Sequence, residues 1–180
     1  MSNTNAPFGL RPTMRTLVGA AGSIIPCHKL VGYGTALFIH DAVTHAAAGT
    51  KNTVAVDAAI TPGTTPVAGV NLIYGAASAA TDHAMVDAAH GIFLTQGDGT
   101  GATFLVAASL SKNANLALTA GNTATKMSKH ELSETSLNTT NTLDLRVRGL
   151  FQDPSNALGQ YAKVFVTFNN LVDANQIAGI

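Results

Sequence analysis

Residues 143–168 read Leu143-Asp-Leu-Arg-Val-Arg-Gly-Leu-Phe151, then Gln152-Asp-Pro-Ser-Asn-Ala-Leu-Gly159, then Gln160-Tyr-Ala-Lys-Val-Phe-Val-Thr-Phe168. In the first and third runs, apolar and polar side chains alternate with the period of two that is typical of a half-buried β-strand. Both runs are rich in residues with high β-propensity. The predicted buried faces consist of Leu143, Leu145 and Val147 on the first run and Ala162, Val164, Val166 and Phe168 on the second.

The residues between the two runs favour a turn. Asp153-Pro154-Ser155-Asn156 contains a proline, which fixes its own φ angle, and Asp and Asn side chains that bond to nearby backbone groups. We therefore predict a long antiparallel hairpin over Leu143–Phe168 that lies in the core sheet.

The rest of the chain also favours short strands. From Ile24 onward, Gly, Pro and Asp interrupt the apolar runs at regular intervals, and long stretches with a helical period are hard to find. This pattern predicts a mainly β fold, a compact antiparallel β-barrel or sandwich. A helix over the Ala-rich segment Ala76–Ala89 is an alternative reading of that segment. The expected strands cover residues 37–43, 53–57, 67–74, 84–87, 92–96 and 103–107.

Three further segments have distinct predictions. Thr61–Pro66 is predicted to be a loop, because it contains two prolines and a glycine. Asp98-Gly99 predicts the tip of a second hairpin over Ile92–Val106, since a tight hairpin turn needs positive φ angles. Ser111–Thr142 is polar and too long for a plain loop, so we expect it to carry short strands or to pack on a partner.

The composition favours a protein with partners. A chain of 180 residues fits one domain and can bury a substantial core. Charged residues make up 11% of the sequence, against about 25% in ordinary soluble domains. Such a surface suits a protein that is largely covered by other subunits, and an Ala/Thr-rich monomer is the alternative.

Several classes of protein are not expected. The net charge is zero and no basic cluster is present, which disfavours nucleic-acid binding. Cys27 is the only cysteine, so no disulfide within the chain can form. The N-terminus lacks the blocks of a signal peptide, and no apolar run approaches the ~18 residues of a membrane span. We expect synthesis in a cytoplasm, solubility, and no contact with nucleic acid or membrane.

Residues 1–22 are predicted to form an extended N-terminal arm, separate from a single β-rich domain at 23–180. Its two prolines disfavour a regular strand or helix. Sixteen extended residues can reach about 50 Å, far enough to lie on a neighbouring subunit. Folding back onto the same domain is the alternative. The predicted arm contacts are Pro7, Phe8, Leu10, Arg11, Pro12, Met14, Arg15 and Leu17.

Two clusters were considered as ligand sites. Gly97–Gly101 is similar to a phosphate-binding glycine loop, but the Lys-Ser/Thr pair and the following helix are missing. Asp82, His83, Asp87 and His90 form the densest set of candidate metal ligands. Their spacing matches no structural zinc pattern, and a single cysteine excludes multi-thiolate sites. We expect neither a metal nor a cofactor.

The sequence also offers little for catalysis. No Gly-x-Ser-x-Gly motif is present. Cys27 and His28 are adjacent, and neighbouring side chains of a strand point to opposite faces, so they make a poor catalytic pair. Glu131 and Glu134 could pair on a helical turn, but their polar segment is not expected to provide apolar walls that raise a pKa. We expect a protein that is not an enzyme.

Three motifs carry a resemblance to a known family. Asn5-Ala-Pro-Phe-Gly-Leu-Arg-Pro12 resembles the opening of the head decoration or capsid cement proteins of tailed bacteriophages. Gly34-Thr-Ala-Leu-Phe-Ile-His-Asp41 is similar to a Gly-x-Ala-x-Phe-x-x-Asp strand of that family. Residues 146–156 and 159–164 are similar to its Arg-Val-x-Gly-Leu-x-x-x-Pro-x-Asn…Gly-x-Tyr-Ala-Lys-Val motif. Between about residues 44 and 143 only the general character of the sequence is similar, and no motif matches.

The resemblance implies a protein that binds the outside of a phage capsid, staples neighbouring major capsid subunits and does no chemistry. It would be made in the host cytoplasm, end up on the outer surface of the virion, and contact the major capsid protein and other copies of itself as a dimer or trimer. A tail or head-completion protein is one alternative. A carbohydrate-binding β-domain is another, although Trp is absent and Tyr33, Tyr74 and Tyr161 are scattered along the chain.

Overall fold

The computed structural model describes residues 3–16, 24–29, 34–45, 54–57, 60–79, 81–89, 91–100, 104–172 and 179, with the backbone alone at 14–16 and 54–57. The described chain is mainly β and contains no α-helix, and therefore no helix able to cross a membrane. Two short 3₁₀ turns, η1 (Ala107–Ser109) and η2 (Glu134–Ser136), interrupt the strands. The strands are β1 (Arg11–Thr16), β2 (Ile24–Lys29), β3 (Ala42–His45), β4 (Val54–Asp57), β5 (Gly69–Asn71), β6 (Thr81–Asp87), β7 (Gly91–Gln96), β8 (Asn113–Ala114), β9 (Leu116–Ala117), β10 (Glu131–Leu132), β11 (Leu145–Leu150) and β12 (Lys163–Phe168).

The predicted hairpin is present as β11 and β12, which lie within a five-stranded antiparallel sheet of order β1-β7-β12-β11-β8. Leu145 pairs with Phe168 and Leu150 with Val164, and a one-residue bulge at Arg148 shifts the register between Val147 and Gly149. The predicted alternation is confirmed within the strands, where Leu145, Val147, Val164, Val166 and Phe168 are buried. Leu143, just before β11, is only partly buried, and Thr167 on the opposite face of β12 is buried as well.

The predicted turn is confirmed as well. Asn156 N donates to Asp153 O over 2.9 Å, which closes a four-residue turn. The Asn156 amide group then donates to Phe151 O and Lys163 O, both over 2.8 Å, and its Oδ1 accepts from Lys163 N. One asparagine side chain therefore holds together the two strands at the point where they leave the sheet.

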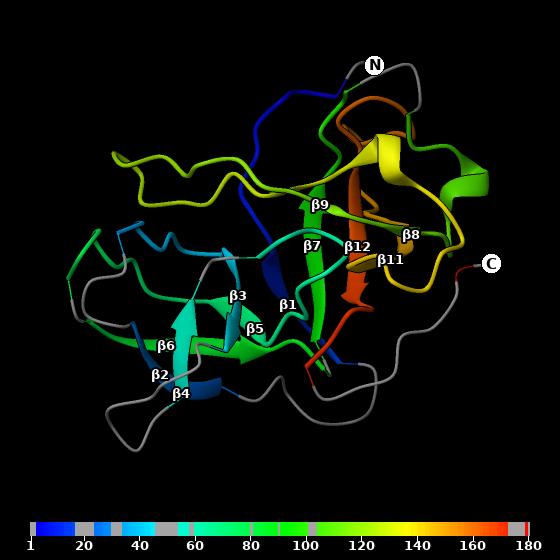
Figure 1. Cartoon of the computed structure of the whole chain (residues 1–180). Helices are drawn as coiled ribbons and strands as arrows, with labels where there is room; N and C mark the ends of the chain where they lie inside the picture. Colours follow the sequence, from blue (N-terminus) through cyan, green and yellow to red (C-terminus); the bar gives the residue numbers. More distant parts are fainter. Residues whose placement is uncertain are drawn as a thin grey trace.

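The remaining long strands pair into a ring beside this sheet. β6 pairs with β2 and β5, and β5 pairs with β3. β4 closes the ring, because it pairs antiparallel with β3 and parallel with β2. In Figure 1 the ring lies at the lower left, and the strands of the five-stranded sheet stand to its right. The two units share one apolar cluster, so the arrangement is sandwich-like rather than one closed barrel. The prediction of a mainly β, antiparallel fold is confirmed.

Two apolar clusters fill the structure. The larger one lies between ring and sheet and joins Val70 and Val86 of the ring to Phe93 and Val166 of the sheet. The smaller one lies inside the ring and consists of Cys27, Leu37, Val43, Ala68 and Met85. Successive side chains of a strand point to opposite faces. Adjacent residues such as Ala42 and Val43 therefore belong to different clusters.

The prediction that prolines keep the N-terminal segment out of a regular sheet is wrong. β1 pairs antiparallel with β7 at the edge of the five-stranded sheet, where Pro12 lies opposite Phe93. An edge strand tolerates proline because half of its N–H groups have no partner strand. Leu10 is fully buried in the larger cluster. Residues 10–16 therefore belong to the domain, and residues 3–9 have no regular structure but bond to the domain through Asn3 and Ala6.

Two other predictions are corrected. The alternative helix over Ala76–Ala89 is wrong, because β6 occupies 81–87 and buries alternate side chains on the ring interior. The second hairpin over Ile92–Val106 is wrong as well. β7 pairs with β1 and β12, and Leu105 bridges to Gly159. Asp98-Gly99 does turn the chain, with φ of +62° at Gly99, but the chain leaves that turn toward a different neighbour.

The predicted loop and the polar segment agree with the structure. Thr61–Pro66 forms turns in which Thr64 N and Thr65 N donate to Thr61 O. Ser111–Thr142 carries the short strands β8, β9 and β10 and the turn η2. Asp144, predicted on the polar face, is instead buried and accepts hydrogen bonds from Gly63 N and Leu116 N. This buried carboxylate joins the loop and the polar segment to the sheet.

Candidate functional site

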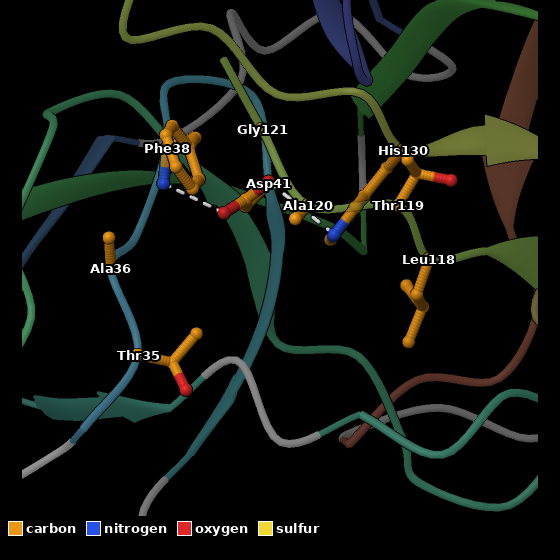
Figure 2. A pocket seen from close by; sticks show the side chains of 9 residues that line it. All are labelled: Thr35, Ala36, Phe38, Asp41, Leu118, Thr119, Ala120, Gly121 and His130. Carbon is orange, nitrogen blue, oxygen red and sulfur yellow. Dashed lines mark hydrogen bonds and ion pairs between the residues drawn. The ribbon is translucent and has the colours of Figure 1, made fainter. Parts of the chain in front are cut away.

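A pocket of about 240 Å³ opens between residues 35–41 and the 118–121 loop, beside His130. Figure 2 shows Asp41 between Phe38, which stands above Ala36 on the left, and His130 on the right. The pocket brings together two ionisable side chains, Asp41 and His130, that come from distant segments of the chain. It is lined by Thr35, Ala36, Phe38, Asp41, Leu118, Thr119, Ala120, Gly121 and His130.

Asp41 is positioned by a tight turn. Phe38 N donates to Asp41 Oδ2 over 2.7 Å, and Asp41 N donates to Phe38 O over 3.2 Å. His40, inside the turn, adopts a φ of +74°, a left-handed conformation that non-glycine residues rarely adopt. The turn places the Asp41 side chain in the protein, where it is 3% exposed.

His130 comes from the opposite side of the pocket. Its Nδ1 accepts a hydrogen bond from Ala42 N over 3.3 Å, so the proton of the neutral ring lies on Nε2. Nε2 is 3.4 Å from Asp41 Oδ1. Burial lowers the pKa of His130, and the Asp41 carboxylate opposes that shift only in part. The imidazole is therefore neutral near pH 7, with both nitrogens directed at other groups of the protein.

Phe38 forms a fixed wall of the pocket. Gly121 packs so closely on its ring that no side chain would fit at that position. The centroid of the Tyr74 ring lies 5.6 Å from that of the Phe38 ring, and the Lys126 ammonium lies 4.3 Å from the Tyr74 centroid. The wall is thus built by tertiary packing of three segments.

This arrangement offers apolar contact more than reaction chemistry. General-base catalysis needs a histidine nitrogen within hydrogen-bond reach of the group that it deprotonates, and both nitrogens of His130 face protein atoms. Asp41 Oδ1 makes no hydrogen bond, but it lies beneath the pocket surface. The groups at the surface are mostly small and apolar, such as Ala36, Leu118 and Ala120.

The expectation that Glu131 and Glu134 lack apolar surroundings is wrong. Glu134 is fully buried and Glu131 is 8% exposed. Burial, with a smaller effect from the Asp98 carboxylate, raises the pKa of each to about 7. Glu131 lies on β10 next to buried Leu132, and Glu134 begins η2. The polar sequence around them folds across the end of the five-stranded sheet, and tertiary packing buries both.

The predicted arm residues do not form one exposed set. Leu10 is buried in the domain's own core, Pro7 and Phe8 are partly buried, and Arg11 is exposed on β1. Pro12 is partly buried at the sheet edge. Leu17 and the side chains of Met14 and Arg15 lie outside the described residues.

The other sequence candidates are also placed. Cys27 is buried inside the ring, and burial raises the pKa of its thiol to about 11, which makes it a poor nucleophile near neutral pH. His83 points into the ring and bonds to Asn71, whereas Asp82 is exposed; His90 lies outside the described residues. Across the described ranges, no three His, Cys, Asp or Glu side chains are grouped so as to hold a metal ion.

No protein-family model, curated protein or solved structure matches this chain.

Sequence reasoning missed the pairing of Asp41 with His130. The two residues are far apart in the sequence, and no local pattern links them. The one available signal was Asp41 itself, the last residue of the second motif.

Proposed function

We propose that this chain is a structural protein of a tailed-bacteriophage head, which binds the outer surface of the capsid and holds neighbouring major capsid subunits together. The observation that carries the proposal is the sequence resemblance at residues 5–12, 34–41 and 146–164. These segments are far apart in sequence, and contacts between them support their reading as one structural signature.

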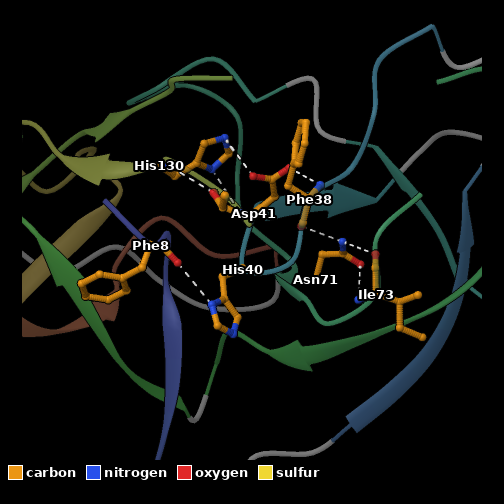
Figure 3. Close-up of polar contacts among 9 residues, drawn as sticks. Phe8, Phe38, His40, Asp41, Asn71, Ile73 and His130 are labelled. Carbon is orange, nitrogen blue, oxygen red and sulfur yellow. Dashed lines mark hydrogen bonds and ion pairs between the residues drawn. The ribbon is translucent and has the colours of Figure 1, made fainter. Parts of the chain in front are cut away.

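The first and second motifs meet directly. Leu10 N donates to His40 O over 3.0 Å, and His40 Nδ1 lies 3.2 Å from Phe8 O. Figure 3 shows Phe8 beside His40, with Asp41 and His130 above them in this view. Gly9, between Phe8 and Leu10, has a φ of +77° and packs against His40, so only glycine fits there.

The N-terminal segment also meets the third motif. Asn3 donates from its side chain to Ala157 O and Gln160 O, and its Oδ1 accepts from Ala157 N. These three bonds fasten the chain just before the first motif to the turn of the β11–β12 hairpin. A combination of motifs that builds one packed unit is the pattern expected when sequences share a fold.

An exposed apolar surface lies at the same end of the molecule. Leu105 bridges antiparallel to Gly159, which places Val106 opposite Leu158 on one face. Val106 is 53% exposed and Leu158 is 39% exposed. We call these two residues, with the exposed Ala107, Ala108 and Ala157, the apical surface. We propose it as the part of the domain that contacts the shell.

The proposed role of the arm is narrower than the sequence indicated. Leu10 cannot contact a partner without leaving its own core. Exposed Arg11 remains available for charge-assisted bonds to carboxylates of the shell. Because deletion of residues 1–16 would also remove β1 from the sheet, such a truncation cannot separate binding from folding.

The function is tested by cryo-electron microscopy of the virions that contain this chain. We expect β-rich density of this shape at repeating positions over the outer shell, in contact with the major capsid protein and with further copies of the chain as a dimer or trimer. Many weak contacts on one repeating lattice would then together give tight binding to the shell. Density confined to the tail or the neck would replace the proposal with the tail or head-completion alternative, and absence from particles would refute it.

The apical surface is tested by shell binding of purified variants. Val106→Asp with Leu158→Asp should keep the melting temperature and lose binding to undecorated shells. Ile24→Asp is the matched control, since Ile24 is 64% exposed on β2, at the opposite end of the molecule in Figure 1. Unchanged binding by the double variant would move the contact elsewhere on the domain.

A further inference from the structure

Glu131 and Glu134 are the only glutamates in the sequence, and both carboxyl groups are buried at one junction. Three of the four carboxyl oxygens, Glu131 Oε1 and both oxygens of Glu134, make no hydrogen bond of good geometry. Native proteins pair nearly all buried polar groups, and an ionised carboxylate without such partners is strongly disfavoured. The geometry therefore favours the protonated form of both side chains.

The surrounding charges act in the same direction. Asp98 faces both glutamates, and its Oδ1 already accepts hydrogen bonds from Thr100 N and Glu134 N. Lys129 favours the ionised form of Glu131, and the backbone N–H groups of Gly99 and Leu105 favour that of Glu134. Burial and Asp98 outweigh these groups, so the pKa of each glutamate is raised to about 7.

The junction connects several parts of the fold. Asp98 N donates to Leu132 O over 2.9 Å, and Gly97 bridges to Leu132 in parallel. Gly97 packs against the Glu134 carboxyl so closely that no side chain would fit there. Gln160 Nε2 donates to Gly99 O over 3.0 Å. The 97–100 loop is thus held between the β10–η2 segment on one side and the hairpin turn on the other.

We propose that Glu131 and Glu134 form a proton-binding pair that keeps the 97–100 loop closed on the β10–η2 segment when protonated and releases it when ionised. Three carboxylates would then share one junction, where mutual repulsion and the gain of hydration favour opening. The pKa of each glutamate in the closed form lies above its usual 4.5. The closed form therefore binds more protons than the open form. It is fully favoured below a pH of about 4.5 and loses that advantage as the pH rises through about 7. This inference does not depend on shell binding.

The first test is a carboxyl NMR titration of the wild-type protein labelled with ¹³C at glutamate. Because the chain has two glutamates, the spectrum contains two side-chain signals and needs no variant for assignment to the pair. We expect both to titrate with apparent pKa values near 7, as properties of the coupled pair. Titration of both signals near 4.5 would overturn the proposal.

The second test is hydrogen exchange of the Asp98 and Glu134 amides at pH 6 and pH 9, corrected for intrinsic exchange. We expect protection to fall at least tenfold at the higher pH. The double variant Glu131→Gln with Glu134→Gln should remove this change, whereas Asp153→Asn, a carboxyl-to-amide control in the hairpin turn, should retain it. Equal protection at both pH values in the wild type would refute the opening.

A third variant covers the case in which the double variant does not fold. Asp98→Asn keeps an oxygen that can accept from Thr100 N and Glu134 N but removes the charge. It should lower the apparent pKa of both glutamates toward 4.5. Unchanged values would show that Asp98 is not part of the device.

Discussion

The five-stranded sheet and the ring are both built from short strands, but their buried faces are filled differently. The face of the sheet in the larger cluster buries mainly apolar side chains such as Val147, Val164 and Val166, with Thr95 opposite Val164. The ring interior places Lys29, Asn71 and His83 beside Cys27 and Met85. Apolar alternation therefore identifies a strand only when its buried face is apolar, and a hydrogen-bonded polar interior leaves no such signal.

The polar side chains of the ring hold one loop across its opening. Asn71 Nδ2 donates to Phe38 O and Ile73 O, and Asn71 Oδ1 accepts from His83 Nδ1 over 2.9 Å. Lys29 Nζ donates to Ala76 O over 2.6 Å. Each bond joins a strand residue to the 71–76 segment or to the Phe38 turn. Hydrogen bonds between buried polar groups help to specify one arrangement, and removing one partner is costly.

The largest expected effect is in the sheet. Val166→Asp, or Val164→Asp, places a carboxylate in a fully buried apolar position, where it costs several kcal/mol. We expect no cooperative thermal transition and insoluble protein. Gln152→Asp, at an exposed position of the same hairpin, should fold normally. A soluble Val166→Asp protein with a sharp melting transition would contradict the placement of β12 in the core.

In the ring, the corresponding experiment removes a polar residue. Asn71→Ala removes the side-chain donor to Phe38 O and Ile73 O and the acceptor of His83 Nδ1, and Phe38 O keeps only the longer bond from Asp41 N. At about 1–3 kcal/mol for each stranded group, we expect a loss of about 3 kcal/mol in the free energy of unfolding, since the loop can relax in part. Urea denaturation measures it, with Asn141→Ala at an exposed position as the control.

A second readout locates that loss in the ring. Cys27 is the only cysteine, and it lies buried inside the ring with the pKa of its thiol raised to about 11. Labelling by a thiol reagent should be slow in the wild type and faster in Asn71→Ala under native conditions. An equal labelling rate would show that Asn71 does not hold the ring closed.

The next effect is smaller and depends on pH. Burial lowers the pKa of His83, and nearby Lys29 lowers it further. A hydrogen bond to the Ile73 backbone and the negative charge of Asp82 raise the pKa of His83, but they offset the lowering only in part. The folded state then binds fewer protons than the unfolded state. The stability contributed by neutral His83 is fully present above pH 6.5 and is lost as pH falls through its lowered pKa.

This acid sensitivity is opposite in sign to that of the two glutamates, so the wild-type profile between pH 4.5 and 7 combines both. His83→Gln should flatten the acid side of the stability profile when it is measured in the Glu131→Gln, Glu134→Gln background. His45→Gln, at an exposed position of β3, is the control. An acid limb that survives His83→Gln unchanged would assign it to His40 or His130, whose pKa values are also lowered by burial.

The sequence predicted the parts of the fold that follow from local pattern. The β11–β12 alternation and the Asp153–Asn156 turn depend on neighbours in the chain, and both are confirmed. The pairing of β7 was mispredicted because Asp98-Gly99 has turn chemistry whatever strand follows it. β1 was missed because proline is forbidden in a central strand but allowed at an edge, and position in the sheet cannot be read locally. Of the candidate site, Asp41, His130 and the buried glutamates depend on contacts between distant segments.

The smallest expected effect concerns the segment that joins the two regions. Asn3 bonds to the hairpin turn of the sheet, while Leu10, seven residues later, bonds to His40 beside the ring. The Asn3 bonds are exposed, so Asn3→Ala should cost at most about 1 kcal/mol of global stability. Its effect should instead be local, since exposed termini open with little free energy unless they are tied down. We expect faster hydrogen exchange at the Ala157 amide and faster proteolysis before Phe8, with no change at β5 or β6 and no change in the Thr4→Ala control. If exchange at Ala157 stays as slow as in the wild type, the hairpin turn holds its shape without the N-terminal segment, and the contact between the first and third motifs is incidental to the fold.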